Sequence, residues 1–208
     1  MRAFVYVGGE IFPEGITERP AEGDLVIAAD SGYRNACELG AKPTVAVGDF
    51  DSLGDVLLPS DVEVLRHPPQ KDETDSQLAV AIALERGATE ITLIGGLSGR
   101  LDHTLSNLAI LEDLQAKGIF GILTDGRNRV RFIRNNSALI GRSEHFTYLG
   151  LIAADEKVKG VDVEGCKYPL RRATLRRREQ YAVSNEIVGT CALIDVRRGG
   201  VWIVESND

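Results

Sequence analysis

Short apolar runs recur along the first 125 residues, with helical patterns between several of them. The runs at residues 4–7, 25–29, 44–47, 62–65, 91–94 and 119–123 are rich in Val and Ile and are bounded by Gly, Pro, Asp or Asn. Near-continuous apolar runs of this length are typical of strands buried on both faces of a parallel sheet. Helical patterns occupy residues 33–39, 75–85 and 104–115. This alternation predicts an α/β domain with a mostly parallel sheet over residues 1–125.

The pattern changes after residue 125, where helical periodicity gives way to period-two alternation. Short strands are predicted at residues 130–133, 146–152, 158–163, 181–183, 191–196 and 201–204. Short strands at this spacing predict a small antiparallel sandwich or barrel over residues 126–208. We expect the domain boundary between residues 125 and 136.

Composition narrows the class of protein. The 208-residue chain has a formal net charge of -7, which argues against general nucleic-acid binding. Its apolar runs fall short of the ~20 residues that a membrane helix needs, and residues 1–9 predict a first strand rather than a signal peptide. Cys37, Cys166 and Cys191 match no zinc or redox spacing and are expected to be reduced. We therefore expect a cytoplasmic protein without nucleic-acid or membrane partners.

Two carboxylates, Asp49 and Asp51, follow the third predicted strand. In an extended backbone the side chains of residues i and i+2 point to the same side, so the two carboxylates converge. At about 4 Å they repel each other by roughly 4 kcal/mol at an effective dielectric near 20. A hard divalent cation with oxygen ligands relieves this repulsion, and Mg²⁺ fits best where phosphates share the ion. A solvated turn is the alternative for an isolated pair.

Other polar segments also stand at predicted strand ends, where open α/β sheets bind their ligands. Asp30 and Ser31 follow the second strand, where they face a ligand or simply cap the next helix. Thr74 and Gln77 form a predicted capping box that starts the helix at residues 75–85.

Lys71, Asp72 and Asp75 crowd the same turn without being needed by the capping box. The ammonium group of Lys71 is suited to phosphate oxygens. Asp75 is placed to join Asp49 and Asp51 around a metal ion. A charged surface at a helix start is the alternative.

The turn after the fifth strand, residues 95–104, is the richest candidate for a phosphate cradle. Glycines such as Gly96 and Gly99 let backbone N–H groups approach an anion closely. Arg100 can fork onto phosphate oxygens, and Asp102 can cap the next helix, hold Arg100 or touch the water shell of a metal ion. The turn matches neither the dinucleotide fingerprint nor a P-loop.

Five arginines between Arg171 and Arg178 form a basic run in an acidic protein. They are interpreted either as solvated strand and turn residues or as an anion-attracting rim.

Taken in order, these segments resemble the thiamine pyrophosphokinase (thiamine diphosphokinase) family. The matching stretches are residues 29–32, 48–52, 71–75, 95–103, 165–170 and 184–186. The resemblance covers nearly the whole chain and implies an α/β catalytic domain followed by a β-sandwich. It also implies ATP and Mg²⁺, and a homodimer with thiamine bound in a cleft at the subunit interface.

The resemblance also assigns roles to individual residues. Asp49, Asp51 and Asp75 resemble the carboxylates that hold the metal. The residues that resemble those around the ATP phosphates and the reacting hydroxyl are Asp30, Lys71, Asp72, Thr74, Arg100 and Asp102. Tyr168 stands where the family places an aromatic ring against thiamine, and Ser184 and Asn185 stand in the thiamine-side loop. Two positions depart from the family pattern: Gln77 replaces an expected Glu, and Ser98 replaces an expected Gly.

The implied reaction transfers the diphosphoryl group of ATP to the hydroxyl of thiamine and releases AMP. The catalytic residues are predicted to be Asp49, Asp51, Lys71, Asp72, Asp75 and Asp102, and the proton acceptor is left open between Asp72 and Asp102. One alternative is another Mg²⁺-dependent phosphotransferase on the same scaffold, acting on a pterin or a sugar alcohol. The other is a non-catalytic relative that binds thiamine or a nucleotide.

Overall fold

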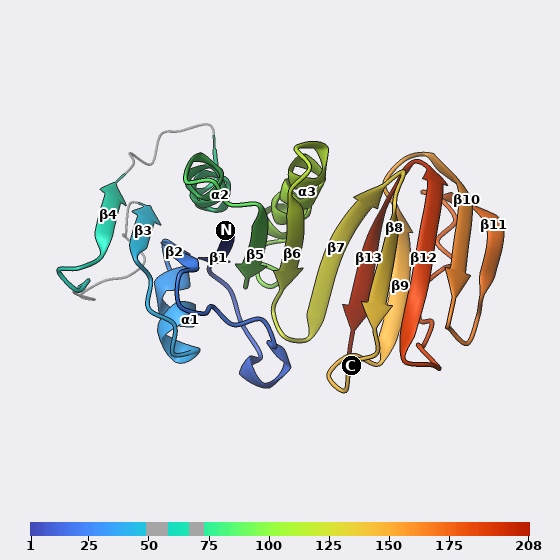
Figure 1. Cartoon of the computed structure of the whole chain (residues 1–208), viewed down its shortest axis with the longest axis horizontal. Coiled ribbons are helices and arrows are strands. Elements are labelled where there is room, and N and C mark those ends of the chain that lie inside the picture. The colour runs from blue at the N-terminus through green and yellow to red at the C-terminus, as the bar shows by residue number, and fades with distance from the viewer. Residues whose placement is uncertain (49–57, 67–72) are drawn as a thin grey trace. The chain divides into compact units, whose positions relative to one another are not determined.

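The computed structural model describes residues 1–48, 58–66 and 73–208 (Figure 1). The chain divides into two compact units, Met1–Gly126 and Arg127–Asp208. Every helix formed by the described residues lies in the first unit. None of these helices combines the length and the apolar character needed to cross a membrane.

Six parallel strands form the sheet of the first unit. They are β1 (Arg2–Tyr6), β2 (Leu25–Ala29), β3 (Val45–Gly48), β4 (Glu63–Arg66), β5 (Glu90–Ile94) and β6 (Phe120–Thr124). Their spatial order is β4-β3-β2-β1-β5-β6. The chain therefore moves outward from β1 to β4 and then returns to the other side of β1. This reversal creates a topological switch point between β1 and β5, where open α/β sheets bind ligands at the carboxyl ends of the strands.

Helices cover both faces of this sheet because its central strands are apolar on both sides. All five residues of β2 are buried, as are four of the five residues of β1. Helix α1 (Gly32–Glu38) packs through Ala36 against Phe4, Tyr6 and Val26. Helices α2 (Asp75–Glu85) and α3 (Leu101–Ala116) contact each other and lie on the opposite face (Figure 1). The 3₁₀ turn η1 (Pro13–Gly15) lies between β1 and β2.

The second unit is a sandwich of two antiparallel sheets. One contains β7 (Asn128–Arg134), β13 (Gly200–Ser206) and β9 (Tyr148–Ala153), in that order. The other has the order β11 (Leu170–Arg176), β10 (Lys157–Glu164), β12 (Cys191–Arg198) and β8 (Ser137–Gly141). Alternate residues of the strands, such as Leu149 and Leu151 in β9 and Ile194 in β12, meet in one apolar core. The predicted fold class, an α/β domain followed by a β-sandwich, is confirmed.

Three details of the second unit differ from the sequence prediction. The strand predicted at residues 181–183 is wrong: this segment meets β9 through a hydrogen bond of 2.7 Å from Leu151 N to Ala182 O, and the isolated bridge to Leu149 is made by Asn185, beyond the segment. Ser184 follows it with φ of 56°, which breaks an extended backbone. Strands β8 and β11 were not predicted. Both are edge strands with one fully buried residue each, so they lack the apolar alternation that signals a strand.

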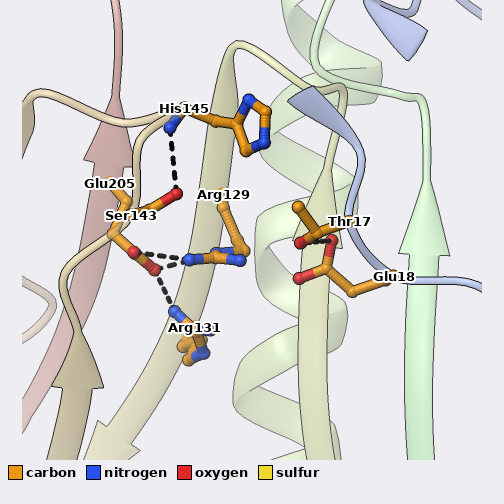
Figure 2. A network of polar contacts seen from close by, with 7 residues as sticks. All are labelled: Thr17, Glu18, Arg129, Arg131, Ser143, His145 and Glu205. Atoms are coloured by element: carbon orange, nitrogen blue, oxygen red, sulfur yellow. Dashed lines mark hydrogen bonds and ion pairs between the residues drawn. The ribbon is translucent and has the colours of Figure 1, made fainter. Parts of the chain in front are cut away.

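A buried ion cluster joins the first and last strands of the second unit (Figure 2). The Glu205 carboxylate is 2% exposed and accepts hydrogen bonds from Arg129 Nε at 2.9 Å, Arg129 Nη2 at 2.7 Å, and Arg131. Arg129 is 9% exposed, and its guanidinium lies 4.6 Å from the centre of the Phe146 ring. Buried charges are tolerated when they are paired and hydrogen-bonded, as Glu205 is here.

We expect Glu205→Ala to lower the free energy of unfolding by about 3–5 kcal/mol, because the buried guanidinium of Arg129 and the partly buried one of Arg131 lose their counter-charge. Urea denaturation monitored by circular dichroism measures this change. Glu164→Ala, an exposed glutamate at the end of β10, is the matched control and should stay within about 0.5 kcal/mol of the wild type. A loss below about 1 kcal/mol for Glu205→Ala would contradict the role given to the cluster.

Candidate active site

A cavity of about 380 Å³ opens at the carboxyl ends of β1, β2 and β5. Its wall is formed by the residues that follow these strands and by the first turns of α2 and α3. Seven of the predicted site residues line it: Asp30, Ser31, Thr74, Asp75, Gly96, Gly99 and Arg100. Because they come from segments far apart in the chain, their meeting at one cavity is a product of the sheet topology.

Four other predicted residues, Asp49, Asp51, Lys71 and Asp72, lie outside the described residues. The described chain approaches the first pair along β3, where Val47 O accepts a hydrogen bond of 2.8 Å from Asp30 N. Within residues 1–48, 58–66 and 73–208, no three His, Cys, Asp or Glu side chains are grouped so that they could hold a metal ion. Of the predicted metal ligands, these ranges contain Asp75 alone.

Asp30 has a left-handed backbone conformation at the end of β2. Its φ is 46°, which is uncommon for a residue other than glycine and is concentrated at functional sites. The backbone holds this geometry from both sides, because Asp30 N donates to Val47 O and Asp30 O accepts from Tyr33 N at 3.1 Å. This turn leads directly into α1 and leaves Asp30 in the cavity wall.

The predicted capping box at the start of α2 is confirmed. Thr74 Oγ1 accepts a hydrogen bond from Gln77 N at 3.2 Å, and Gln77 Oε1 accepts one from Thr74 N at 2.9 Å. Gln77 therefore performs the capping role of a glutamate without its charge. The Thr74 hydroxyl still has a proton to donate, and Asp75 becomes the first helical residue beside the cavity.

Arg100 and Asp102 are paired with each other at the start of α3. Arg100 donates to Asp102 from Nε at 3.2 Å and from Nη2 at 2.6 Å, and Asp102 Oδ1 also accepts from His103 N at 3.0 Å. The hydrogen bond from Arg100 lowers the pKa of the Asp102 carboxyl. In this arrangement both Asp102 oxygens accept hydrogen bonds, Oδ1 from Arg100 and His103 and Oδ2 from Arg100.

The glycine turn after β5 depends on the absence of a side chain at Gly96. This residue has φ of 74°, and a Cβ there would lie 2.4 Å from Asn107 Nδ2 and 2.8 Å from Val7 Cγ2. Asn107 in α3 and Asn35 in α1 are buried beside this region, and the sequence analysis missed both. A single Asn inside a helical pattern carries little signal, because it fits a polar face equally well.

In the second unit the structure brings together Tyr168 and Asn185 but not Ser184. Asn185 Oδ1 accepts from Tyr168 N at 2.9 Å, and Asn185 Nδ2 donates to Tyr168 O at 2.8 Å. Both residues line a cavity of about 130 Å³, whereas Ser184 lines a separate cavity of about 540 Å³ with Tyr148 and Ser206. The Asn185 amide therefore holds the backbone of Tyr168, and the Tyr168 side chain remains exposed.

The second unit also contains a cavity of about 640 Å³ that is lined by none of the predicted site residues. Two of its acidic residues already have basic partners: Glu205 pairs with Arg129 and Arg131, and Glu186 pairs with Lys167 at 2.9 Å. These carboxylates are satisfied without a ligand. We therefore regard the smaller cavity of the first unit, with its converging polar residues, as the better candidate for chemistry.

Comparison with known families gives two matches along the chain. The model described as thiamin pyrophosphokinase, catalytic domain, matches residues 20–121. The model described as thiamin pyrophosphokinase, vitamin B1 binding domain, matches residues 138–201. The first falls within the α/β unit and the second within the β-sandwich.

Similar proteins carry the same name. Thiamine pyrophosphokinase of Bacillus subtilis is 27% identical over 191 residues, which cover 90% of this chain and 89% of that protein. Thiamin pyrophosphokinase 1 of Caenorhabditis elegans is 29% identical over 153 residues, which cover 70% of this chain and 63% of that protein.

Solved structures agree in fold over almost the whole length. The crystal structure of thiamine pyrophosphokinase from Bacillus subtilis superposes with a TM-score of 0.88 at 25% identity and covers 100% of both chains. Thiamin pyrophosphokinase from Candida albicans has the same fold, with a TM-score of 0.78 at 16% identity over 99% of this chain and 90% of that one. Since both domain models match in order and together span most of the sequence, the chain belongs to the thiamine pyrophosphokinase family.

Proposed function

We propose that this chain is an enzyme that transfers the diphosphoryl group of ATP to the hydroxyl of thiamine, yielding thiamine diphosphate and AMP. The observation that carries the proposal is the convergence of seven polar and glycine residues on one cavity in a member of this family. Free thiols at Cys37, Cys166 and Cys191 are in keeping with the cytoplasm, which we propose as its compartment.

The cavity offers the donors that phosphate groups need. The amino-terminal end of α2 and the glycine turn before α3 line the cavity, which suits them to bind an anion, and Arg100 adds a guanidinium. The ion pair between Arg100 and Asp102 is largely exposed, so Arg100 can exchange this partner for a phosphate at small cost. Lys71 is proposed to add a further positive charge. We therefore assign the nucleotide phosphates to this cavity.

We propose that Mg²⁺ is held by Asp49, Asp51 and Asp75. The donor set suits the ion because all three supply hard carboxylate oxygens. Asp75 lines the cavity, and β3 leads toward Asp49 beside Asp30, so the set is compatible with the described residues. When bound, such an ion neutralises phosphate charge and orients the transferred group.

In the proposed reaction, the thiamine hydroxyl oxygen attacks the β-phosphorus of ATP in line. The bond between the β-phosphorus and the oxygen that bridges to the α-phosphorus breaks, and AMP leaves with that oxygen. The hydroxyl proton passes to a carboxylate. Asp72 and Asp102 are the two candidates for this acceptor. Catalysis then depends mainly on positioning and charge neutralisation.

We propose that the second unit binds thiamine and that the chain acts as a homodimer with the thiamine cleft at the subunit interface. The match to a vitamin B1 binding domain supports the first assignment. The exposed Tyr168 ring is proposed to pack against the thiamine rings, with Asn185 holding its backbone in place. Ser184, which lines the separate cavity of about 540 Å³, is proposed as a further residue on the thiamine side.

Incubation of the purified chain with ATP, Mg²⁺ and thiamine should yield thiamine diphosphate and AMP in equal amounts. Both products are quantified by ion-exchange chromatography, with thiamine-free and Mg²⁺-free reactions as controls. Release of ADP instead of AMP would indicate a phosphotransferase of another kind. Binding of thiamine or ATP without nucleotide turnover would indicate a non-catalytic relative. Either result would overturn the proposal.

Asp75→Asn and Asp49→Asn should each lower kcat by about 10²–10³-fold, because each removes a preorganised charge from the reacting centre. The far-ultraviolet circular dichroism spectrum should be unchanged in both. Asp61→Asn, at an exposed position of the same unit, is the matched control and should retain wild-type turnover. Near-normal formation of thiamine diphosphate by both active-site variants would rule out the metal assignment.

A further inference from the structure

We infer that Asn35, Ser98 and Asn107 act together as positioning residues that hold two glycine turns in the shape that binds nucleotide phosphates. The turns are residues 8–10, after β1, and residues 95–99, after β5. We call the three side chains the turn clamp. The inference rests on the proposed function, because it takes the nucleotide as the ligand of this cavity.

Asn35 holds the turn after β1 from the side of α1. Its side chain is 8% exposed, and its Nδ2 donates to Val7 O at 2.8 Å and to Gly9 O at 3.0 Å. An amide nitrogen has two protons, so both donors of Asn35 are used, one on the residue before this turn and one within it. Asn35 therefore acts on the backbone around Gly8 rather than on a ligand.

Asn107 holds the other turn from the side of α3. Its side chain is 4% exposed, and Nδ2 donates to Gly96 O at 3.0 Å. Gly96 N in turn donates to Gly8 O at 2.9 Å. The two turns are thus joined directly through Gly8 and Gly96, and a buried amide braces each of them.

Ser98 adds a second link between the turns. Its Oγ accepts a hydrogen bond of 2.7 Å from Glu10 N. This is the position where the resemblance to the family leads us to expect glycine, and a glycine has no oxygen for this bond. The link is consequently a feature of this chain's own side chains.

The clamp matters because the turns are intrinsically permissive. Gly9, Gly95, Gly96 and Gly99 all have φ between 74° and 104°, and glycine samples many other conformations at little cost. A turn that is already fixed loses less conformational entropy when a phosphate binds. Loss of the clamp should therefore weaken binding of the phosphate-bearing substrate while leaving thiamine binding unchanged.

The test compares Asn35→Ala, Asn107→Ala and Ser98→Ala with Ser98→Thr, which keeps the hydroxyl. Calorimetry measures the Kd of a non-hydrolysable ATP analogue, and steady-state kinetics measures KM for ATP and for thiamine separately. We expect both nucleotide constants to rise roughly tenfold in the two Asn variants and about threefold in Ser98→Ala. KM for thiamine and both nucleotide constants of Ser98→Thr should stay within about twofold of wild type.

Control substitutions test whether the effect is local to the clamp. Ser106→Ala precedes Asn107 on α3, and Glu38→Ala is exposed near the end of α1. Both should leave the nucleotide constants within about twofold of wild type. Equal losses in the control and clamp variants would overturn the inference.

The outcomes separate the clamp from the proposed function. Clamp variants that fold and bind the analogue like wild type, or that raise both KM values equally, overturn the clamp alone. If the Asn variants do not fold, the comparison of Ser98→Ala with Ser98→Thr tests the clamp. Both are expected to fold, because Ser98 is half-buried in a turn. A wild-type protein that forms no AMP overturns the proposed function, and the Kd of the analogue still tests the clamp.

Discussion

The central constraint on the first unit is that both faces of its parallel sheet are buried, so the strands hold few polar side chains along their length. Strands β1 and β2 are almost entirely apolar, so the charged and glycine residues gather beyond their carboxyl ends. The reversal of strand order around β1 then brings the ends of β1, β2 and β5 together. Asp30, Asp75 and Gly96 meet at one cavity for this reason.

Some residues around this cavity present polar groups to it, whereas others hold the backbone of its wall in shape. Thr74 illustrates both roles, since its oxygen caps α2 while its proton remains available. Asn35 and Asn107 belong to the second group, because their amide groups are directed at backbone carbonyls. The same division holds in the second unit, where Asn185 fixes the backbone that presents Tyr168.

The β-sandwich is constrained differently, because its strands are antiparallel and each has one face toward the core. Its apolar core is interrupted at one end by the pairing of Glu205 with Arg129 and Arg131. The basic run falls largely on β11, an edge strand, where Arg171 and Arg172 are exposed. Charged side chains on an edge strand disfavour pairing with other chains. This agrees with the interpretation of these arginines as solvated strand residues.

Sequence alone determined the fold class, most strands and the three helices, because period and apolar runs report burial directly. It also located the capping box of Thr74 and Gln77, whose partners lie three residues apart. Contacts between distant segments were decided by the tertiary structure: the pairing of Glu205 with Arg129, the link from Ser98 to Glu10, and the bracing of Gly96 by Asn107. The edge strands β8 and β11 belong to this second group, since hydrogen bonds to a neighbour define an edge strand even where its own residues are mostly exposed.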